Sequence, residues 1–173
     1  MRLRAYIEET DFPYIRKWLQ DERTHYLWCA GLLQYPLQQD GFRDFLRKNA
    51  AEWEDSPYIV TDDDGRPMGF FSYNINHREN YGFLKFIVLD NELRGHGTGS
   101  RMIRMICRFA FEITGVSSLK INVFDINKAA VGCYRKAGFA EEGREMNVLT
   151  FHGEVWNRIH MIRYNDVTHY NEN

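Results

Sequence analysis

Apolar and polar positions along the chain recur at the spacing of strands and helices, which predicts a mixed α/β fold. Residues 3–8 have the alternation of a strand, and Asp11 is expected to cap the helix that follows. Residues 21–36 have no steady period, so we expect a loop or broken helix with aromatic contacts there. A second helix is predicted from Leu37 to about Trp53. Its expected buried side consists of Phe42, Phe45, Leu46 and Trp53.

The middle of the chain alternates between strand patterns and turns. Residues 58–61 and 67–76 are predicted to form a hairpin, with Gly65 supplying the positive φ of the turn. A further strand is expected at residues 81–89, and a cluster of glycines follows it. The helix after this cluster is amphipathic and should end at Gly115. Its predicted apolar face consists of Met102, Ile106, Phe109 and Ile113.

The last third of the chain predicts a strand, a short helix and a hairpin. Residues 119–124 alternate as in a strand, and Asn127 is expected to cap a helix that ends at Gly138. Two further strands are predicted at about 140–149 and 154–163. The strand before Asn127 therefore leads directly into a helix, which is an arrangement that can present side chains to a ligand.

Composition and charge narrow the class of protein. The chain has 173 residues, of which 44% are hydrophobic and 27% charged, so one globular domain over residues 1–164 and a polar tail over 165–173 are expected. A net charge of -2 argues against a nucleic-acid partner. The absence of a long apolar stretch argues against a membrane partner and favours a cytoplasmic protein. The three cysteines have no metal-binding spacing, and no metal is predicted.

The glycine cluster lies between a predicted strand and a predicted helix. Glycines there let the backbone approach a bulky anion, and the amides at the start of a helix point outward with a partial positive charge. Arg94 adds a full charge, so a diphosphate group is the expected ligand; a tight turn without any ligand is the alternative. The residues predicted to bind the diphosphate are Arg94, Gly95, His96, Gly97, Thr98, Gly99 and Ser100.

Two common phosphate-binding motifs fit this cluster poorly. A P-loop requires a lysine after its last glycine, whereas Gly99 is followed by Ser100. A dinucleotide fingerprint requires a later third glycine and an acidic residue about twenty positions further on, where this chain has Lys120. The P-loop is excluded, and dinucleotide binding remains the weaker alternative.

A second motif runs from Asn127 to Phe139. Asn127 and Tyr134 are seven residues apart, and two helical turns place them on the same face of the predicted helix. Both side chains could therefore reach one ligand. The alternative for Tyr134 is packing in the core with its hydroxyl bonded to a neighbour.

Together the two motifs resemble those of the GNAT superfamily of acetyltransferases. The matching residues are Arg94, Gly97 and Gly99 in the first motif and Asn127, Ala130, Tyr134, Gly138 and Phe139 in the second. The resemblance implies acetyl-coenzyme A as the cofactor. It also implies a mixed, mostly antiparallel and splayed sheet of about seven strands flanked by about four helices, which agrees with the predicted order of elements.

The remainder of the chain is similar to particular branches of this superfamily. Residues 141–143 and 153–161 resemble the branch of ribosomal-protein alanine and spermidine acetyltransferases, and residues 18–19 and 57–59 resemble aminoglycoside acetyltransferases. These resemblances imply a primary amine acceptor, which could be a polyamine, a protein N-terminus or an aminoglycoside-like amine. A homodimer is a reasonable expectation because sheet edges would be exposed.

The resemblance also implies a mechanism of direct attack in a ternary complex. The Leu89 amide would bind the thioester oxygen, and Tyr134 would protonate the leaving thiolate. The strand at residues 81–86 has no acidic residue, so the base stays unassigned between a water chain, Glu79 and a residue of the loop with Tyr26. A catalytically inactive module that binds acyl-coenzyme A is the alternative, and the length of the acyl group is open.

Overall fold

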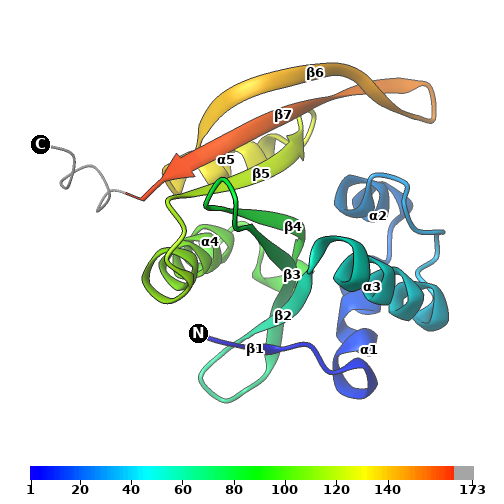
Figure 1. Ribbon diagram of the computed structural model, residues 1–173. Helices are drawn as coiled ribbons and strands as arrows, with labels where there is room; N and C mark the ends of the chain where they lie inside the picture. The colour runs from blue at the N-terminus through cyan, green and yellow to red at the C-terminus, as the bar shows by residue number, and fades with distance from the viewer. Residues whose placement is uncertain (166–173) are drawn as a thin grey trace, which may run out of the picture. The chain divides into compact units, whose positions relative to one another are not determined.

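The computed structural model describes residues 1–165 and contains one hydrogen-bonded sheet with five α-helices in these residues (Figure 1). The strands are β1 (Arg2–Ala5), β2 (Ser56–Thr61), β3 (Pro67–Asn76), β4 (Tyr81–Leu89), β5 (Ser118–Phe124), β6 (Ala140–Phe151) and β7 (Glu154–Tyr164). The helices are α1 (Glu8–Trp18), α2 (Glu22–Cys29), α3 (Gln39–Trp53), α4 (Thr98–Arg108) and α5 (Lys128–Lys136).

The strand order is β1-β2-β3-β4-β5-β7-β6. The pairs β1–β2, β2–β3, β5–β7 and β6–β7 are antiparallel, whereas β4 and β5 are parallel. The predicted mixed, mostly antiparallel sheet of seven strands is therefore confirmed. Within residues 1–165, none of the helices is both long and apolar enough to cross a membrane.

The described chain divides into two compact units. Unit 1 consists of residues 1–74 and 85–99, and unit 2 consists of residues 75–84 and the chain from Ser100 on. The expectation of one domain over residues 1–164 stays a prediction. The polar tail predicted for 165–173 lies outside the described residues, except for Asn165.

Unit 1 has an aromatic core formed largely by α1, α2, α3 and the strands β2 and β3. Phe42 contacts Phe70 edge-to-face with ring centroids 5.7 Å apart, and it also contacts Trp28 at 5.7 Å. Such ring pairs add to the free energy gained by burying apolar area. The core residues are Phe12, Ile15, Trp18, Leu19, Trp28, Cys29, Leu37, Phe42, Ile59, Phe70 and Val88.

Asp11 lies inside α1, so its prediction as the N-cap residue is wrong. The helix already begins at Glu8, and Ile7 occupies the cap position. The buried Asp11 carboxylate accepts a hydrogen bond from the Ile7 amide at 2.7 Å and two from the Arg4 guanidinium at 2.6 Å each. From the first turn of α1, the Asp11 carboxylate thus binds the amide of the preceding Ile7 and joins the start of the helix to Arg4 of β1.

The second and third helices agree with the predicted pattern in part. Residues 21–36, expected as a loop or broken helix, contain α2, whose N-cap Asp21 accepts the Thr24 amide at 2.8 Å. The prediction that Trp53 is buried is wrong, because its side chain is 61% exposed. Trp53 lies in the last turn of α3, and its ring is 5.8 Å from the ammonium group of Lys85. The helical period puts Trp53 on the same face of α3 as Phe42, but the core of unit 1 does not extend to this last turn.

Unit 2 contains β5, β6, β7, α4 and α5. The helix that begins at Thr98 changes to a π-helical turn at Phe109–Thr114 and ends at Gly115 with φ 72°. The wider turn shifts the helix face, so that Ala110 is buried and Ile113 is 75% exposed. The predicted burial of Ile113 is therefore wrong, whereas Met102 and Ile106 are buried as expected.

The turns predicted from glycine and asparagine are confirmed. Gly65, Gly138 and Gly153 have φ angles of 87°, 90° and 82°, and Asn127 caps α5.

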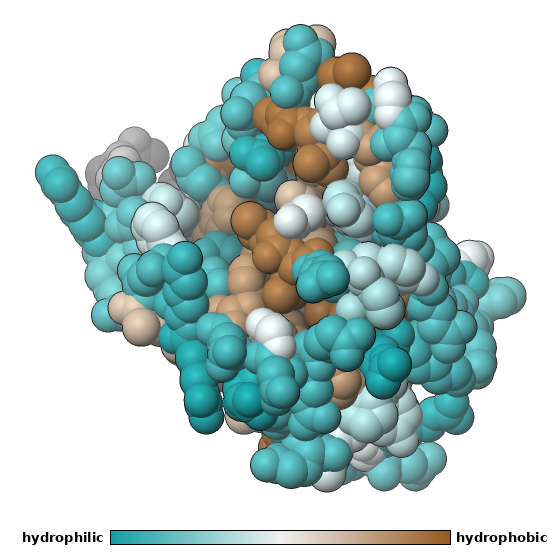
Figure 2. Space-filling view, turned by 90° about the vertical axis from the view of Figure 1, so that its right-hand side faces the viewer, coloured by the Kyte–Doolittle hydropathy of each residue, from teal (hydrophilic) through white to brown (hydrophobic). Residues whose placement is uncertain are grey.

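Most of the face in Figure 2 is hydrophilic, with hydrophobic residues visible in a band between hydrophilic ones.

Replacing Asp11 by asparagine should lower the free energy of unfolding by about 3 kcal/mol, because Arg4 loses a buried partner. The pKa of Asp11 is lowered: burial opposes ionisation, but Arg4, the Ile7 amide and Thr10 outweigh it. A lowered pKa stabilises the fold above the ordinary aspartate pKa and ceases to do so as the pH falls through the lowered value. The difference between the two proteins in urea denaturation should therefore shrink on acidification. Asp40→Asn, at a residue that is 82% exposed, is the control and should change stability by less than about 1 kcal/mol.

Candidate functional site

The segment after β4 is held in place by one buried aspartate. The Asp90 amide donates to the Met68 carbonyl at 2.8 Å, and the Asp90 carboxylate accepts the Glu92 amide at 3.0 Å. These bonds start a 3₁₀ turn at Asn91–Leu93. The turn brings the chain from the end of the strand to the predicted diphosphate cradle, residues 94–100.

The cradle presents backbone amides that the protein itself does not use. Gly95 and Gly97 have φ angles of 83° and 77°, which strongly disfavour other residues. A Cβ added at either position would meet no heavy atom within 4 Å, so this backbone faces open space. The amides of residues 95–97 donate no hydrogen bond to the described chain, and the first four amides of α4 have no partner within the helix. This segment can therefore bind an anion.

The side chain of Arg94 turns back onto the strand. Its Nε and Nη2 atoms donate to the Leu89 carbonyl at 3.3 and 3.1 Å. The guanidinium thereby fixes the peptide that follows Leu89. Sequence reasoning gave Arg94 only the role of a positive charge for the anion, whereas in the structure it also orients the end of β4.

Asn127 is the N-cap of α5 in unit 2. Its Oδ1 atom accepts the Ala130 amide at 3.2 Å, and its carbonyl accepts the Val131 amide at 3.0 Å. The side-chain oxygen is thus used by the helix. The side-chain amide forms no hydrogen bond within residues 1–165, and this group can donate to a ligand.

Tyr134 lies two turns further along α5, as predicted. Its side chain is 7% exposed, yet its hydroxyl forms no hydrogen bond with any residue of the described chain. Burial raises the pKa of this hydroxyl above its ordinary value, and the neighbouring Cys133 acts in the same direction. The expectation of a core tyrosine with a satisfied hydroxyl therefore does not describe it. A protonated phenol without a partner is suited to donate a proton.

The end of α5 is fixed by Arg163. Its Nη1 atom donates to the Ala137 carbonyl at 2.6 Å, and its side chain lies 3.3 Å from where a Cβ on Gly138 would be. The Tyr134 carbonyl in turn accepts the amides of Ala137 and Phe139. The glycine thus provides both the left-handed turn and the space for the arginine.

Ser100 has a partner in unit 2. Its hydroxyl donates to the Cys133 thiol at 3.5 Å, directly before Tyr134 in the sequence. Of the predicted site residues, the structure thus joins Leu89 to Arg94, and the Ser100 side chain to the helix that carries Tyr134. The first pair belongs to unit 1 and the second to unit 2. His96 is exposed, and Thr98 is buried at the start of α4.

A strained residue in β4 was not foreseen from the sequence. Phe86 has a φ of 51°, in the left-handed region that bulky residues rarely adopt. The Trp28 indole donates to the Phe86 carbonyl at 2.6 Å, which holds this conformation. Next to it, Lys85 forms an ion pair with the buried Asp55 at 2.9 Å. Because these contacts join distant segments, no local pattern could have predicted them.

The two protein candidates for the catalytic base are Glu79 and the segment around Tyr26. Glu79 is exposed, and its amide is bonded to the Asn76 side chain at 3.0 Å. The loop expected around Tyr26 is part of α2. Among the described residues, no group of three or more His, Cys, Asp and Glu side chains is arranged to bind a metal.

Three glutamates of β6 are engaged in ion pairs. Glu141 pairs with Arg144 at 3.1 Å, and Glu145 pairs with Arg158 at 3.0 Å. Glu142 pairs with Lys120 at 3.4 Å. These carboxylates are therefore already partnered by cationic side chains of unit 2.

Comparisons with known proteins agree on one family. The model of the acetyltransferase (GNAT) family matches residues 12–139, which include the glycine cluster and the motif from Asn127 to Phe139. The match covers more than half of the chain.

The two relatives that follow are 28% and 30% identical to this chain over the aligned residues. A spermidine N(1)-acetyltransferase of Escherichia coli is 28% identical over 119 residues, which are 68% of this chain and 63% of the relative. The chain thus spans less than two thirds of that enzyme. A thialysine N-epsilon-acetyltransferase of Bos taurus is 30% identical over 132 residues, which are 69% of this chain and 72% of the relative.

Solved structures share the fold. The spermidine N-acetyltransferase of Vibrio cholerae, determined in complex with CoA and spermine, matches with a TM-score of 0.78 and 20% identity. The match covers 94% of each chain. At this identity the similarity establishes the fold alone.

Replacing Gly97 by alanine should weaken coenzyme A binding by about tenfold or more, because the left-handed residue becomes strained and a methyl group enters the open side of the cradle. Isothermal titration calorimetry with coenzyme A measures this. Gly65→Ala is the matched control: Gly65 has a similar φ of 87° and an equally free Cβ position, but it lies in the β2–β3 turn. That variant should lose similar stability and keep its affinity. Unchanged affinity of Gly97→Ala would contradict the assignment of the cradle.

Proposed function

The chain belongs to the GNAT acetyltransferase family, and from this premise we propose that it transfers an acetyl group from acetyl-coenzyme A to a primary amine. The observation that carries the proposal is the run of unused amides at residues 95–97 and at the start of α4. Coenzyme A contains a diphosphate group, which such amides bind well. A Cβ added at Gly95 or Gly97 would meet no heavy atom within 4 Å, which leaves room for this group.

The proposed role of Leu89 concerns the carbonyl of the thioester. Attack by an amine produces a tetrahedral oxyanion, and one preorganised amide donor contributes about 3 kcal/mol to its stabilisation. The Leu89 amide is assigned to this role. Its support is the double hydrogen bond from Arg94 to the Leu89 carbonyl, which limits movement of the strand end.

The proposed role of Tyr134 is that of the general acid. When the intermediate collapses, the sulfur of coenzyme A leaves as a thiolate and takes up one proton, which the phenol supplies. The raised pKa keeps the phenol protonated at neutral pH, and its hydroxyl has no competing acceptor in the described chain. The side-chain amide of Asn127 is assigned to the cofactor as a hydrogen-bond donor.

The proposed acceptor is a primary aliphatic amine, and polyamines are the class to test first. Support comes from the relatives, which are named for spermidine and thialysine, and from an aminoglycoside N(6')-acetyltransferase of Klebsiella pneumoniae that is 23% identical over 147 residues. This aminoglycoside match covers 78% of this chain and 72% of the relative. All three names denote transfer to an amine nitrogen.

A thiol-release assay with acetyl-coenzyme A tests the function. Spermidine, thialysine, an aminoglycoside and a peptide with a free N-terminus are offered in parallel, and mass spectrometry identifies the acetylated product. We expect turnover with at least one aliphatic amine. Tight binding of coenzyme A without turnover on any amine would instead identify an inactive acyl-coenzyme A-binding module. Preference for NAD over coenzyme A in calorimetry would reject both.

Replacing Tyr134 by phenylalanine should lower kcat by about 100-fold and change the KM for acetyl-coenzyme A little, since only the proton donor is lost. Steady-state kinetics with the best amine from the panel measure both. Because the pKa of the hydroxyl is raised, the wild type should show no loss of kcat from deprotonation of Tyr134 below about pH 10. Tyr14→Phe, at an exposed position of α1, is the control. An unchanged kcat in Tyr134→Phe would remove the phenol from the mechanism.

A further inference from the structure

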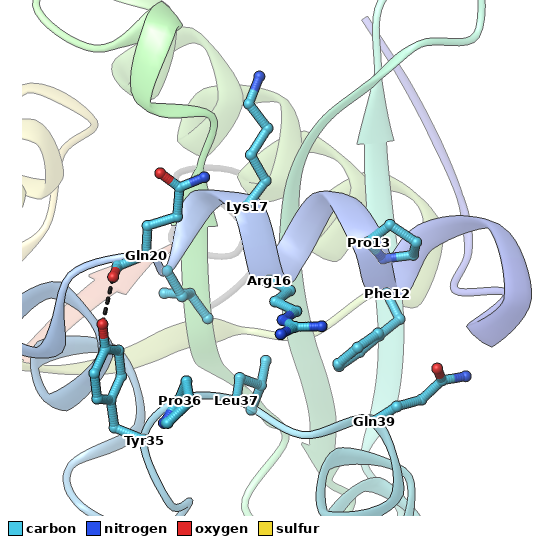
Figure 3. Close-up of a pocket in the computed structure, with 10 residues that line it drawn as sticks. Phe12, Pro13, Arg16, Lys17, Gln20, Tyr35, Pro36, Leu37 and Gln39 are labelled. Carbon is cyan, nitrogen blue, oxygen red and sulfur yellow. Dashed lines mark hydrogen bonds between the residues drawn. The ribbon is translucent and has the colours of Figure 1, made fainter.

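A pocket in unit 1 lies between α1 and the segment that precedes α3 (Figure 3). Its volume is about 540 Å³, within the range of roughly 300–1,000 Å³ typical of small-molecule sites. None of its lining residues belongs to the cradle or to α5. The residues that matter for its chemistry are Phe12, Pro13, Arg16, Tyr35, Pro36 and Leu37.

About half of the lining of the pocket is apolar, and the apolar part is contributed by Phe12, Pro13, Leu19, Pro36 and Leu37. Phe12 and Leu37 are buried members of the unit 1 core, and each presents one side to the pocket. Pro13 and Pro36 extend this surface, and neither carries an amide hydrogen. The Tyr35 hydroxyl donates to the Gln20 carbonyl, which closes one end (Figure 3). These walls can bury an apolar ligand body.

Arg16 contributes to this pocket a positive charge that no residue in 1–165 neutralises by an ion pair. Its guanidinium points into the space between α1 and the segment around Leu37 (Figure 3), and it forms no hydrogen bond or ion pair with any residue in 1–165. The other cation, Lys17, pairs with Glu92 at 3.0 Å and extends away from the pocket. The Gln39 side-chain amide donates to Glu8 at 3.1 Å. One positive charge is thus left for a ligand.

We propose that this pocket binds a small organic carboxylate with an apolar body, at a site separate from the residues assigned to acetyl-coenzyme A. A guanidinium offers two parallel donors that match the two oxygens of a carboxylate. The apolar part of the lining favours contact with the remainder of the ligand. An amine is disfavoured because Arg16 repels it, and a phosphate dianion is disfavoured because the second cation is already paired. The site therefore differs in ligand class from the amine-acceptor site of the proposed function.

Phenylacetate is a suitable probe, with its neutral isostere phenylacetamide and inorganic phosphate as comparisons. Calorimetry measures affinity, and amide chemical shifts of residues 12–20 and 35–39 report where the probe binds. The variant is Arg16→Met, which keeps much of the side-chain length and removes the charge. The control is Arg47→Met on α3, because Arg47 is also exposed and without an ion pair in the described part of the chain. Thermal unfolding verifies that both variants are folded.

We expect phenylacetate to bind and to shift residues of the pocket, with at least tenfold weaker binding in Arg16→Met and unchanged binding in Arg47→Met. Phenylacetamide and phosphate should bind at least tenfold more weakly than phenylacetate. Binding should persist when coenzyme A is saturating. The proposal is overturned by equal affinity in Arg16→Met, by equal affinity for phenylacetamide or phosphate, or by displacement of phenylacetate by coenzyme A. None of these results depends on acetyl transfer, so the proposed function stands or fails independently.

Discussion

Backbone amides without an acceptor in the protein are the constraint from which the candidate site follows. An amide that loses water must find another acceptor, and the amides of residues 95–97 and of the first turn of α4 have none in the described chain. Left-handed glycines at 95 and 97 keep these groups turned outward. The Arg94 guanidinium, which is itself a donor, is bonded to the Leu89 carbonyl and does not accept from these amides. The loop therefore stays open to an anion from solution.

The strand before this loop holds a second constraint. A left-handed phenylalanine is unfavourable by about 1–2 kcal/mol, and Phe86 keeps this conformation with the help of the Trp28 indole. The register between β4 and β5 ends at Leu84, two residues earlier. The strand residues after Leu84 make further contacts, including the Lys85–Asp55 ion pair.

What the sequence predicted correctly depends on local chemistry. The hairpin at Gly65, the cap at Asn127 and the bounds of β4 follow from turn residues and from alternation, which act within a few positions. The failures at Asp11 and Trp53 come from a partner on β1 and from the limit of the core, and the failure at Ile113 comes from a π-helical turn that breaks the regular helical period. The same distinction applies to the site. Glycines and the Asn127–Tyr134 spacing are visible in the sequence, whereas the Trp28–Phe86 bond and the free hydroxyl of Tyr134 depend on the folded chain.

Charged side chains that are already paired within the protein recognise a charged ligand poorly. The three glutamates of β6 are matched by Arg144, Lys120 and Arg158, so three negative and three positive charges cancel. This strand therefore supplies no net attraction for a polycation. The pairing of these charges also favours the proposed acetyl transfer. A carboxylate-rich surface raises the pKa of a bound amine, whereas direct attack requires the neutral amine.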